Sequence, residues 1–188
     1  MSDTAAADGE LMRRAAAGDE AAARLLVERH LPRAIGLAFR MLGNPASAED
    51  VAQDAFLRLW KQASRWRAEA RVGTWLYTVV HNLCLDELRQ PMRRAGELDP
   101  ELADSRETAA AARQRSEVST LVEAELQALS ERQRTALALV HYEQVAAGKA
   151  AAIMGVSIEA LESLLARGRR TLRARLAGLR PDLLGGVE

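Results

Sequence analysis

The apolar residues of this chain recur every three to four positions along most of its length, which is the spacing of one face of an α-helix. In the N-terminal half they predict helices at about residues 8–17 and 19–42. Two more helices are expected to follow, one capped by Ser47 and one capped by Thr74 and ended by Pro91. The pattern therefore predicts four helices in the first half of the chain.

The helix expected after Ser47 has an apolar stripe and a polar face. Apolar pairs repeat every four residues from Val51 to Trp60. The polar residues outside this stripe include Asp50, Gln53, Asp54 and Arg58. We expect this polar face to be exposed.

A less regular, basic stretch follows that helix. Five cations and a single acid lie between residues 58 and 71, with Trp66 among them and Trp75 just beyond. Cations interleaved with aromatic rings are typical of surfaces that bind single-stranded nucleic acid, where bases stack on the rings. The alternative is a place in the core: Trp60 and Trp75 fit the apolar stripes and are expected to be buried. Trp66 lies off any clear stripe and is the better candidate for a base contact.

The helical period fades between residues 92 and 118. We interpret this stretch as a linker between two domains, residues 8–91 and residues 119–180. The second domain begins with another amphipathic segment, which is followed by a capping-box pattern at Ser130.

Residues 147–165 have the pattern of a helix-turn-helix. Ala151 is the small residue expected where the two helices touch, and Gly155 is a turn residue that tolerates positive φ. Ser157 is a good N-cap for the second helix. Two leucines are spaced to face inward, Leu161 and Leu164.

Five arginines and no acid lie between residues 167 and 175, directly behind this motif. A solvated face is one interpretation, but the position favours contact with DNA phosphates, which the arginine fork suits. Residues 158–166 would then point to base edges in the major groove.

Composition agrees with a fold built only of helices. Ala (37 residues) and Leu (27 residues) are strong helix formers, and strand-type runs are almost absent, which excludes an all-β fold. The 26 basic and 26 acidic residues cancel, so net charge does not argue for or against nucleic acid. The single cysteine, Cys84, excludes an intramolecular disulfide and a multi-cysteine zinc site. We expect no cofactor and no metal.

The chain has no stretch of the roughly 18 to 20 apolar residues that cross a membrane. Residues 1–14 carry three acids and no apolar signal-peptide core. A cytoplasmic, all-α protein with two small domains is therefore expected, without membrane insertion.

Three stretches of the chain resemble bacterial sigma factors. Residues 48–60, AEDVAQDAFLRLW, resemble the family's most characteristic segment. Residues 74–77, TWLY, look like the start of its promoter-recognition helix, and residues 129–170 are similar to its C-terminal domain. The short length, with a linker where larger members carry a further domain, points to the extracytoplasmic-function (ECF) class of the sigma-70 family.

This resemblance implies a factor that binds core RNA polymerase, directs it to promoters and helps to open the DNA. In the family, the acidic helix docks on the clamp coiled coil of the largest polymerase subunit, and the C-terminal domain meets the flap. The positions that match the docking helix are Asp50, Gln53, Asp54 and Arg58.

The resemblance also assigns the promoter contacts. Positions matching those that hold the unstacked −10 strand are Trp66, Arg71, Thr74, Trp75, Asn82, Asp86 and Arg89. Positions matching those that face the −35 duplex are Ser157, Glu162, Ser163, Ala166, Arg167, Arg169, Arg170 and Arg173. Members are usually held inactive by an anti-sigma factor, so we expect one here.

The second domain departs from the family pattern at two places. Glu162 stands where a basic residue is common, and a carboxylate would accept a hydrogen bond from a cytosine amino group. Gly148 lies in the expected first helix of the motif and costs about 1 kcal/mol relative to alanine in a helix interior.

Two other classes of function remain to be compared. A regulator whose first domain senses a ligand would explain the helix-turn-helix, but not the 48–60 pattern. An enzyme is disfavoured because no catalytic residue stands out: His30, His81 and His141 share no triad or metal-ligand spacing with one another or with Cys84.

Overall fold

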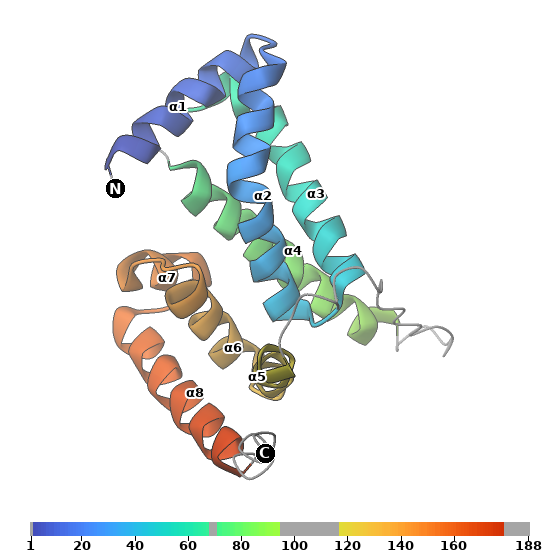
Figure 1. Ribbon diagram of the computed structural model, residues 1–188, viewed down its shortest axis with the longest axis vertical. Coiled ribbons are helices and arrows are strands. Elements are labelled where there is room, and N and C mark those ends of the chain that lie inside the picture. The colour runs from blue at the N-terminus through green and yellow to red at the C-terminus, as the bar shows by residue number, and fades with distance from the viewer. Residues whose placement is uncertain (1, 68–70, 95–116, 179–188) are drawn as a thin grey trace, which may run out of the picture. The chain divides into compact units, whose positions relative to one another are not determined.

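The computed structural model describes residues 2–67, 71–94 and 117–178, and these residues contain helices and no strand. They form two compact units (Figure 1), the first built from α1 to α4 and the second from α5 to α8. The expected all-helical, two-domain fold is confirmed. Residues 95–116, most of the expected linker, lie outside the described part of the chain.

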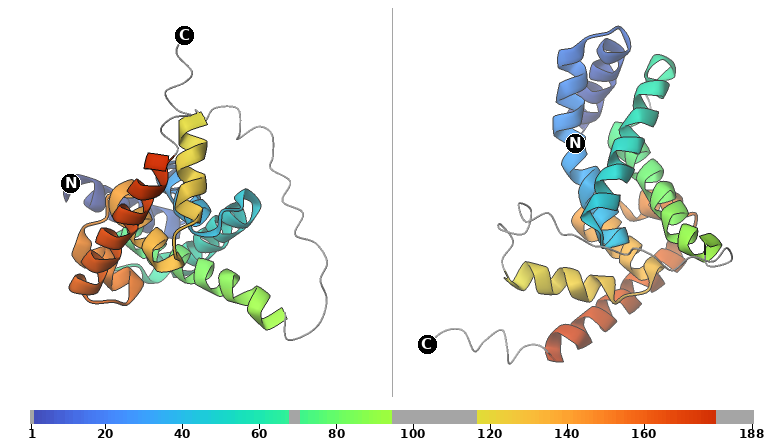
Figure 2. Two further views of the ribbon diagram at one scale, coloured as in Figure 1. Left: turned by 90° about the horizontal axis from the view of Figure 1, so that it is seen from below. Right: turned by 90° about the vertical axis from the view of Figure 1, so that its right-hand side faces the viewer.

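The first unit is a set of helices around one apolar core. Its elements are α1 (Ser2–Ala16), α2 (Glu20–Leu42), α3 (Pro45–Gln62), the 3₁₀ turn η1 (Ala63–Arg65) and α4 (Val72–Arg94). The helix α2 contacts both α1 and α4 (Figures 1 and 2). Fully buried side chains from α1, α2, α3 and α4, among them Met12, Leu26, Leu59 and Leu76, fill the space between them.

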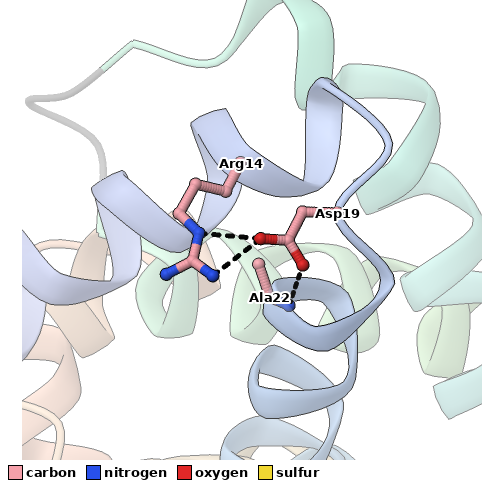
Figure 3. Close-up of polar contacts among 3 residues, drawn as sticks. All are labelled: Arg14, Asp19 and Ala22. Atoms are coloured by element: carbon pink, nitrogen blue, oxygen red, sulfur yellow. Dashed lines mark hydrogen bonds and ion pairs between the residues drawn. The ribbon is translucent and has the colours of Figure 1, made fainter.

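The turn between α1 and α2 is held by one carboxylate (Figure 3). Gly18 adopts a φ of 90°, which a residue with a side chain rarely does, and Asp19 then caps α2. Its Oδ1 accepts a hydrogen bond from the Ala22 N–H at 3.1 Å, and its Oδ2 accepts two from Arg14 at 2.8 and 2.6 Å. The bond from Ala22 and those from Arg14 lower the pKa of Asp19. This cap explains why the predicted boundary near residue 19 is correct.

Four predicted helix ends in this unit are wrong. The helix α1 begins at Ser2 and not near residue 8. The helix α3 begins at Pro45, whose fixed φ suits the first helical position, so Ser47 lies inside the helix. The helix α4 begins at Val72, because Arg71 O accepts the first helical bond, from the Trp75 N–H at 3.0 Å. Thr74 is therefore inside α4, and its carbonyl accepts a bond from Thr78 Oγ1. Pro91 does not end α4, which continues to Arg94.

In its described residues, 117–178, the second unit contains four helices and one π-helical segment. Its elements are α5 (Glu117–Gln127), α6 (Glu131–Leu137), η3 (Ala138–Tyr142), α7 (Ala147–Met154) and α8 (Ile158–Gly178). The long helix α8 packs against α5, α6 and α7 (Figure 2). Gly168 allows the close approach of α8 to α6, since a Cβ there would lie 3.0 Å from Leu137 Cδ1. This packing explains the glycine within the arginine-rich stretch.

The junction between α5 and α6 depends on Arg134. Its Nη1 donates to Gln127 O at 2.9 Å and to Gln127 Oε1 at 2.8 Å, which joins the end of α5 to α6. Burial lowers the pKa of Arg134, opposed by the charge of Glu131. Ser130 occupies the predicted N-cap position of α6, but its hydroxyl makes no capping bond.

Candidate functional site

The polar face of α3 is exposed, as the sequence predicted. Asp50, Gln53, Asp54 and Arg58 all lie at the surface, while the apolar stripe of the helix is buried. Leu57 lies on the same exposed face and keeps 52% of its surface accessible. An apolar side chain among polar ones on a helix is a sequence signal of a contact surface, and Leu57 was not among the residues predicted for this face.

Beside this face runs a groove of about 490 Å³ between α2 and α3. Its residues are Val27, Leu31, Ile35, Glu49, Asp50, Gln53, Phe56, Leu57 and Trp60. The groove thus has apolar walls and an acidic rim at the N-terminal end of α3. A helix with an apolar stripe and basic flanks has the complementary chemistry.

Trp66 and Trp75 form an aromatic pair across the segment that joins α3 to α4. Their ring centroids lie 5.9 Å apart with an interplanar angle of 77°, an edge-to-face arrangement. Both side chains are partly exposed, so the expectation that Trp75 is buried is wrong. Trp60 is also only partly buried; it packs on Phe56 and borders the α2–α3 groove. Trp60 and Trp75 thus lie at the edges of their apolar stripes and not at the centres.

The outer face of α4, with Arg71 just before the helix, carries the other residues predicted for the −10 element. Trp75, Asn82 and Arg89 follow one another at intervals of about two turns and therefore share this face. Thr74 lies partly exposed near its start, and Arg71 and Asp86 are exposed. The opposite face is buried through Leu76, Val80 and Cys84. Thr78 lies between Trp75 and Asn82 along α4, and its hydroxyl donates to Thr74 O at 3.0 Å.

The geometry of the helix-turn-helix agrees with the sequence pattern. Gly155 ends α7 in the left-handed conformation, with φ 63°. Ser157 Oγ accepts a hydrogen bond from the Ala160 N–H at 3.2 Å and so caps α8. The contact residues Ala151, Leu161 and Leu164 are buried. Gly148 lies in the first turn of α7 and not in its interior, so the predicted cost of about 1 kcal/mol is an overestimate there.

The eight residues predicted to face the −35 duplex are all exposed. They are Ser157, Glu162, Ser163, Ala166, Arg167, Arg169, Arg170 and Arg173. The seven on α8 fall within about half of the helix circumference, opposite the buried leucines, so they form one face of the helix. Arg175 is outside this face, and its guanidinium pairs with Glu125 of α5. The exposed arginines of this face thus differ from Arg175, which forms an ion pair with another helix.

The described residues contain no group of three or more His, Cys, Asp or Glu side chains that could hold a metal ion. The histidines lie in different environments: His30 bonds to Asp8, His81 is buried in α4, and His141 is exposed. Cys84 is fully buried, and its burial, with a smaller contribution from Glu87, raises the pKa of the thiol to about 12.

Within residues 2–67, 71–94 and 117–178, no helix has the length and apolar character needed to span a bilayer.

Comparison with known proteins gives the same division of the chain. The family model of sigma-70 region 2 matches residues 26–94, and that of sigma-70 region 4 matches residues 119–172. The ECF RNA polymerase sigma factor SigM of Mycobacterium tuberculosis is 33% identical over 172 residues, which cover 91% of this chain and 85% of that protein. The RNA polymerase sigma-H factor of Pseudomonas aeruginosa is 28% identical over 183 residues, with 92% and 95% covered.

Two solved structures have a similar fold. The sigma factor RpoE of Bartonella quintana, in complex with the anti-sigma factor NepR, has a TM-score of 0.71 at 23% identity, covering 82% of this chain and 96% of that one. CnrH, in complex with the cytosolic domain of CnrY, has a TM-score of 0.66 at 26% identity, covering 92% and 98%.

These matches exclude the ligand-sensing regulator as the explanation of the first unit, because region 2 accounts for it. They also place the chain among RNA polymerase sigma factors. With region 2 in the first unit and region 4 in the second, the chain belongs to the ECF class of sigma-70 factors and acts in promoter recognition and transcription initiation.

Proposed function

We propose that the α2–α3 groove and the polar face of α3 dock on the clamp coiled coil of the largest polymerase subunit. The observation that carries this proposal is the exposed Leu57 beside an apolar groove with Asp50 and Gln53 on its rim. An apolar contact flanked by acids gives affinity from burial and orientation from charge. Asp54 and Arg58 extend the same polar face.

The outer face of α4 and the Trp66–Trp75 pair then hold the unstacked −10 strand. Unstacking a base costs a few kcal/mol, and a preformed aromatic surface offsets that cost. Trp66 and Trp75 are already packed against each other and partly exposed, which supports this role. Asn82 and Thr74 supply hydrogen bonds to the strand, while Arg71 and Arg89 neutralise phosphates. Asp86 Oδ1 lies 3.9 Å from Arg89 Nη1, and this carboxylate reduces the net positive charge of the outer face of α4.

The exposed face of α8 reads the −35 element as duplex DNA. Glu162, Ser163, Ala166 and Arg167 lie in its first half and are the base-facing positions. Arg169, Arg170 and Arg173 follow and hold phosphates, while Ser157 keeps its hydroxyl on the N-terminus of the helix. We place the end of the first domain at Arg94 and the start of the second at Glu117, where α4 ends and α5 begins. The second domain meets the polymerase flap.

An anti-sigma factor is the second partner that we propose. The structure of the sigma factor RpoE contains the anti-sigma factor NepR, and that of CnrH contains the cytosolic domain of CnrY. The same exposed surfaces, the α2–α3 groove and the arginine face of α8, offer an inhibitor sites that also block polymerase or DNA.

The docking proposal is tested by Asp50→Lys, which reverses one charge on the rim of the groove. We expect affinity for core polymerase to fall at least about tenfold, or about 1.4 kcal/mol, and run-off transcription to fall with it. Glu10→Lys is the matched control, since Glu10 is an exposed acid in α1 and its ion pair with Arg13 is a surface pair. Unchanged core affinity of Asp50→Lys, or an equal loss in Glu10→Lys, would refute the docking site.

A further inference from the structure

The helix α1 contacts the two elements, η1 and α4, that flank the segment carrying Trp66. It packs against η1, whose last residue, Arg65, directly precedes Trp66. It also packs against α4, whose first residue, Val72, directly follows Arg71 (Figure 1). The placement of α1 therefore affects where the chain enters and leaves this segment.

A cluster around the buried carboxylate of Asp8 holds α1 in this place. Asp8 is a residue of α1 whose side chain is only 6% exposed. Its Oδ2 lies 2.9 Å from His30 Nε2, and its Oδ1 accepts a hydrogen bond from Arg29 Nη1. Both partners belong to α2. Removing one partner from a buried charge costs far more than breaking a surface pair, so this cluster is a strong constraint on α1.

The other edge of the His30 ring faces the first turn of α4. His30 is 11% exposed, and a Cβ built on Gly73 would lie 3.6 Å from its Cε1 and 3.7 Å from its Nδ1. The imidazole thus lies between Asp8 on one side and the backbone of α4 on the other. Any shift of the ring toward or away from Asp8 changes the support under the N-terminal turn of α4, two residues before Trp75.

We propose that the cluster of Asp8, Arg29 and His30 positions the Trp66–Trp75 pair for capture of the −10 strand. The three residues touch no DNA; they act by fixing α1 against η1 and by supporting the start of α4. The proposal rests on the role proposed above for Trp66 and Trp75. It predicts a defect in strand capture that is separable from polymerase docking, because none of the three residues lines the α2–α3 groove.

The test compares Asp8→Asn with Glu10→Gln in holoenzyme assembled from the full chain. Both changes remove one negative charge from α1 and break one pair with an arginine, but only Asp8 is buried and bonded to α2. The measurements are affinity for core polymerase and affinity for promoter DNA with a preformed single-stranded bubble at −10. We expect Asp8→Asn to bind the bubble about tenfold more weakly, or about 1.4 kcal/mol, with unchanged core affinity. Glu10→Gln should match the wild type in both.

A second variant separates positioning from general loss of stability. His30→Leu fills a similar space but offers no donor to Asp8. If Asp8 and His30 act as one unit, the double variant Asp8→Asn/His30→Leu loses no more bubble affinity than the more impaired single variant. Additive losses would overturn the proposal, and so would a parallel fall in core affinity, because that would show damage to the whole unit.

Trp66→Ala distinguishes this inference from the function on which it rests. If Trp66→Ala weakens bubble binding and Asp8→Asn does not, the positioning role is wrong and strand capture stands. If Trp66→Ala leaves bubble binding unchanged, strand capture by the aromatic pair is itself refuted, and the positioning role falls with it.

Discussion

Cys84 illustrates how far a single residue can be interpreted before its surroundings are known. From the sequence it lies on the apolar face of a helix, and a redox role stayed open. In the structure the side chain is fully buried in α4, and desolvation of the thiolate raises its pKa to about 12. The reactive form is therefore scarce at neutral pH.

We expect Cys84 to react with a thiol reagent at pH 8 only when the first unit unfolds. Because burial raises the pKa of the folded-state thiol to about 12, the folded protein holds a far smaller thiolate fraction than the unfolded protein at both pH 7 and pH 9, so its labelling rate should be far lower at both. Mass spectrometry of timed labelling, with and without denaturant, measures both rates. Fast labelling of the folded chain would contradict the buried position.

The tryptophans show the limit of residue-level interpretation. Trp66 was correctly separated from the apolar stripes, but Trp60 and Trp75 were expected in the core and are partly exposed. Periodicity places a residue on a face of a helix, whereas exposure depends on which neighbours cover that face. The Trp66–Trp75 contact joins two elements and is invisible in the spacing of either one.

Among the elements, the helix-turn-helix was predicted in most detail, and its turn can be tested directly. Gly155 has a φ of 63°, and no heavy atom would meet a Cβ built there. Gly155→Ala should therefore destabilise the second unit through backbone strain alone, by about 1 kcal/mol. Thermal or urea unfolding followed by circular dichroism measures the change.

Gly148→Ala is the matched control for this prediction. Gly148 also has open space around its Cα, but it lies in the first turn of α7 with no positive φ. The same substitution there should leave stability unchanged or raise it by up to about 1 kcal/mol. Equal effects at the two glycines would mean that the left-handed turn is not what Gly155 provides.

Helix interiors were easier to predict than helix ends. The apolar stripes of α3 and α4 are correct, yet both helices begin upstream of their predicted caps. A side chain can cap a helix only if the residues before it are not helical. Residues 45 and 46 precede Ser47 within α3, and residues 72 and 73 precede Thr74 within α4. The predicted cap at Ser157 was correct because Gly155, two residues before it, has a positive φ that turns the backbone out of the preceding helix.

For the chain as a whole, zero net charge conceals surfaces of opposite sign. Acids border the α2–α3 groove, while α8 exposes Arg167, Arg169, Arg170 and Arg173 on one face. A surface of this kind binds duplex DNA through release of counterions, which makes affinity depend steeply on salt.

Arg170→Ala should weaken binding of the −35 duplex by holoenzyme to a similar degree for different sequences. The slope of log affinity against log salt concentration should become shallower by about one. Arg175→Ala removes the same charge from the same helix, but Arg175 pairs with Glu125, so its slope should stay at the wild-type value. Fluorescence anisotropy across a salt series measures both, and a sequence-dependent loss in Arg170→Ala would make Arg170 a base reader.

The helical class, the stripes that form the core, the helix-turn-helix and the family resemblance follow from the amino-acid sequence alone. These features depend on neighbours a few residues apart, whose periodicity and capping are visible in a short stretch of sequence. The groove between α2 and α3, the Trp66–Trp75 pair, the partner of Arg175 and the buried Asp8–His30 contact became known from the tertiary structure. Each joins residues of separate segments of the chain, and the packing that brings them together depends on the combined shapes of many side chains.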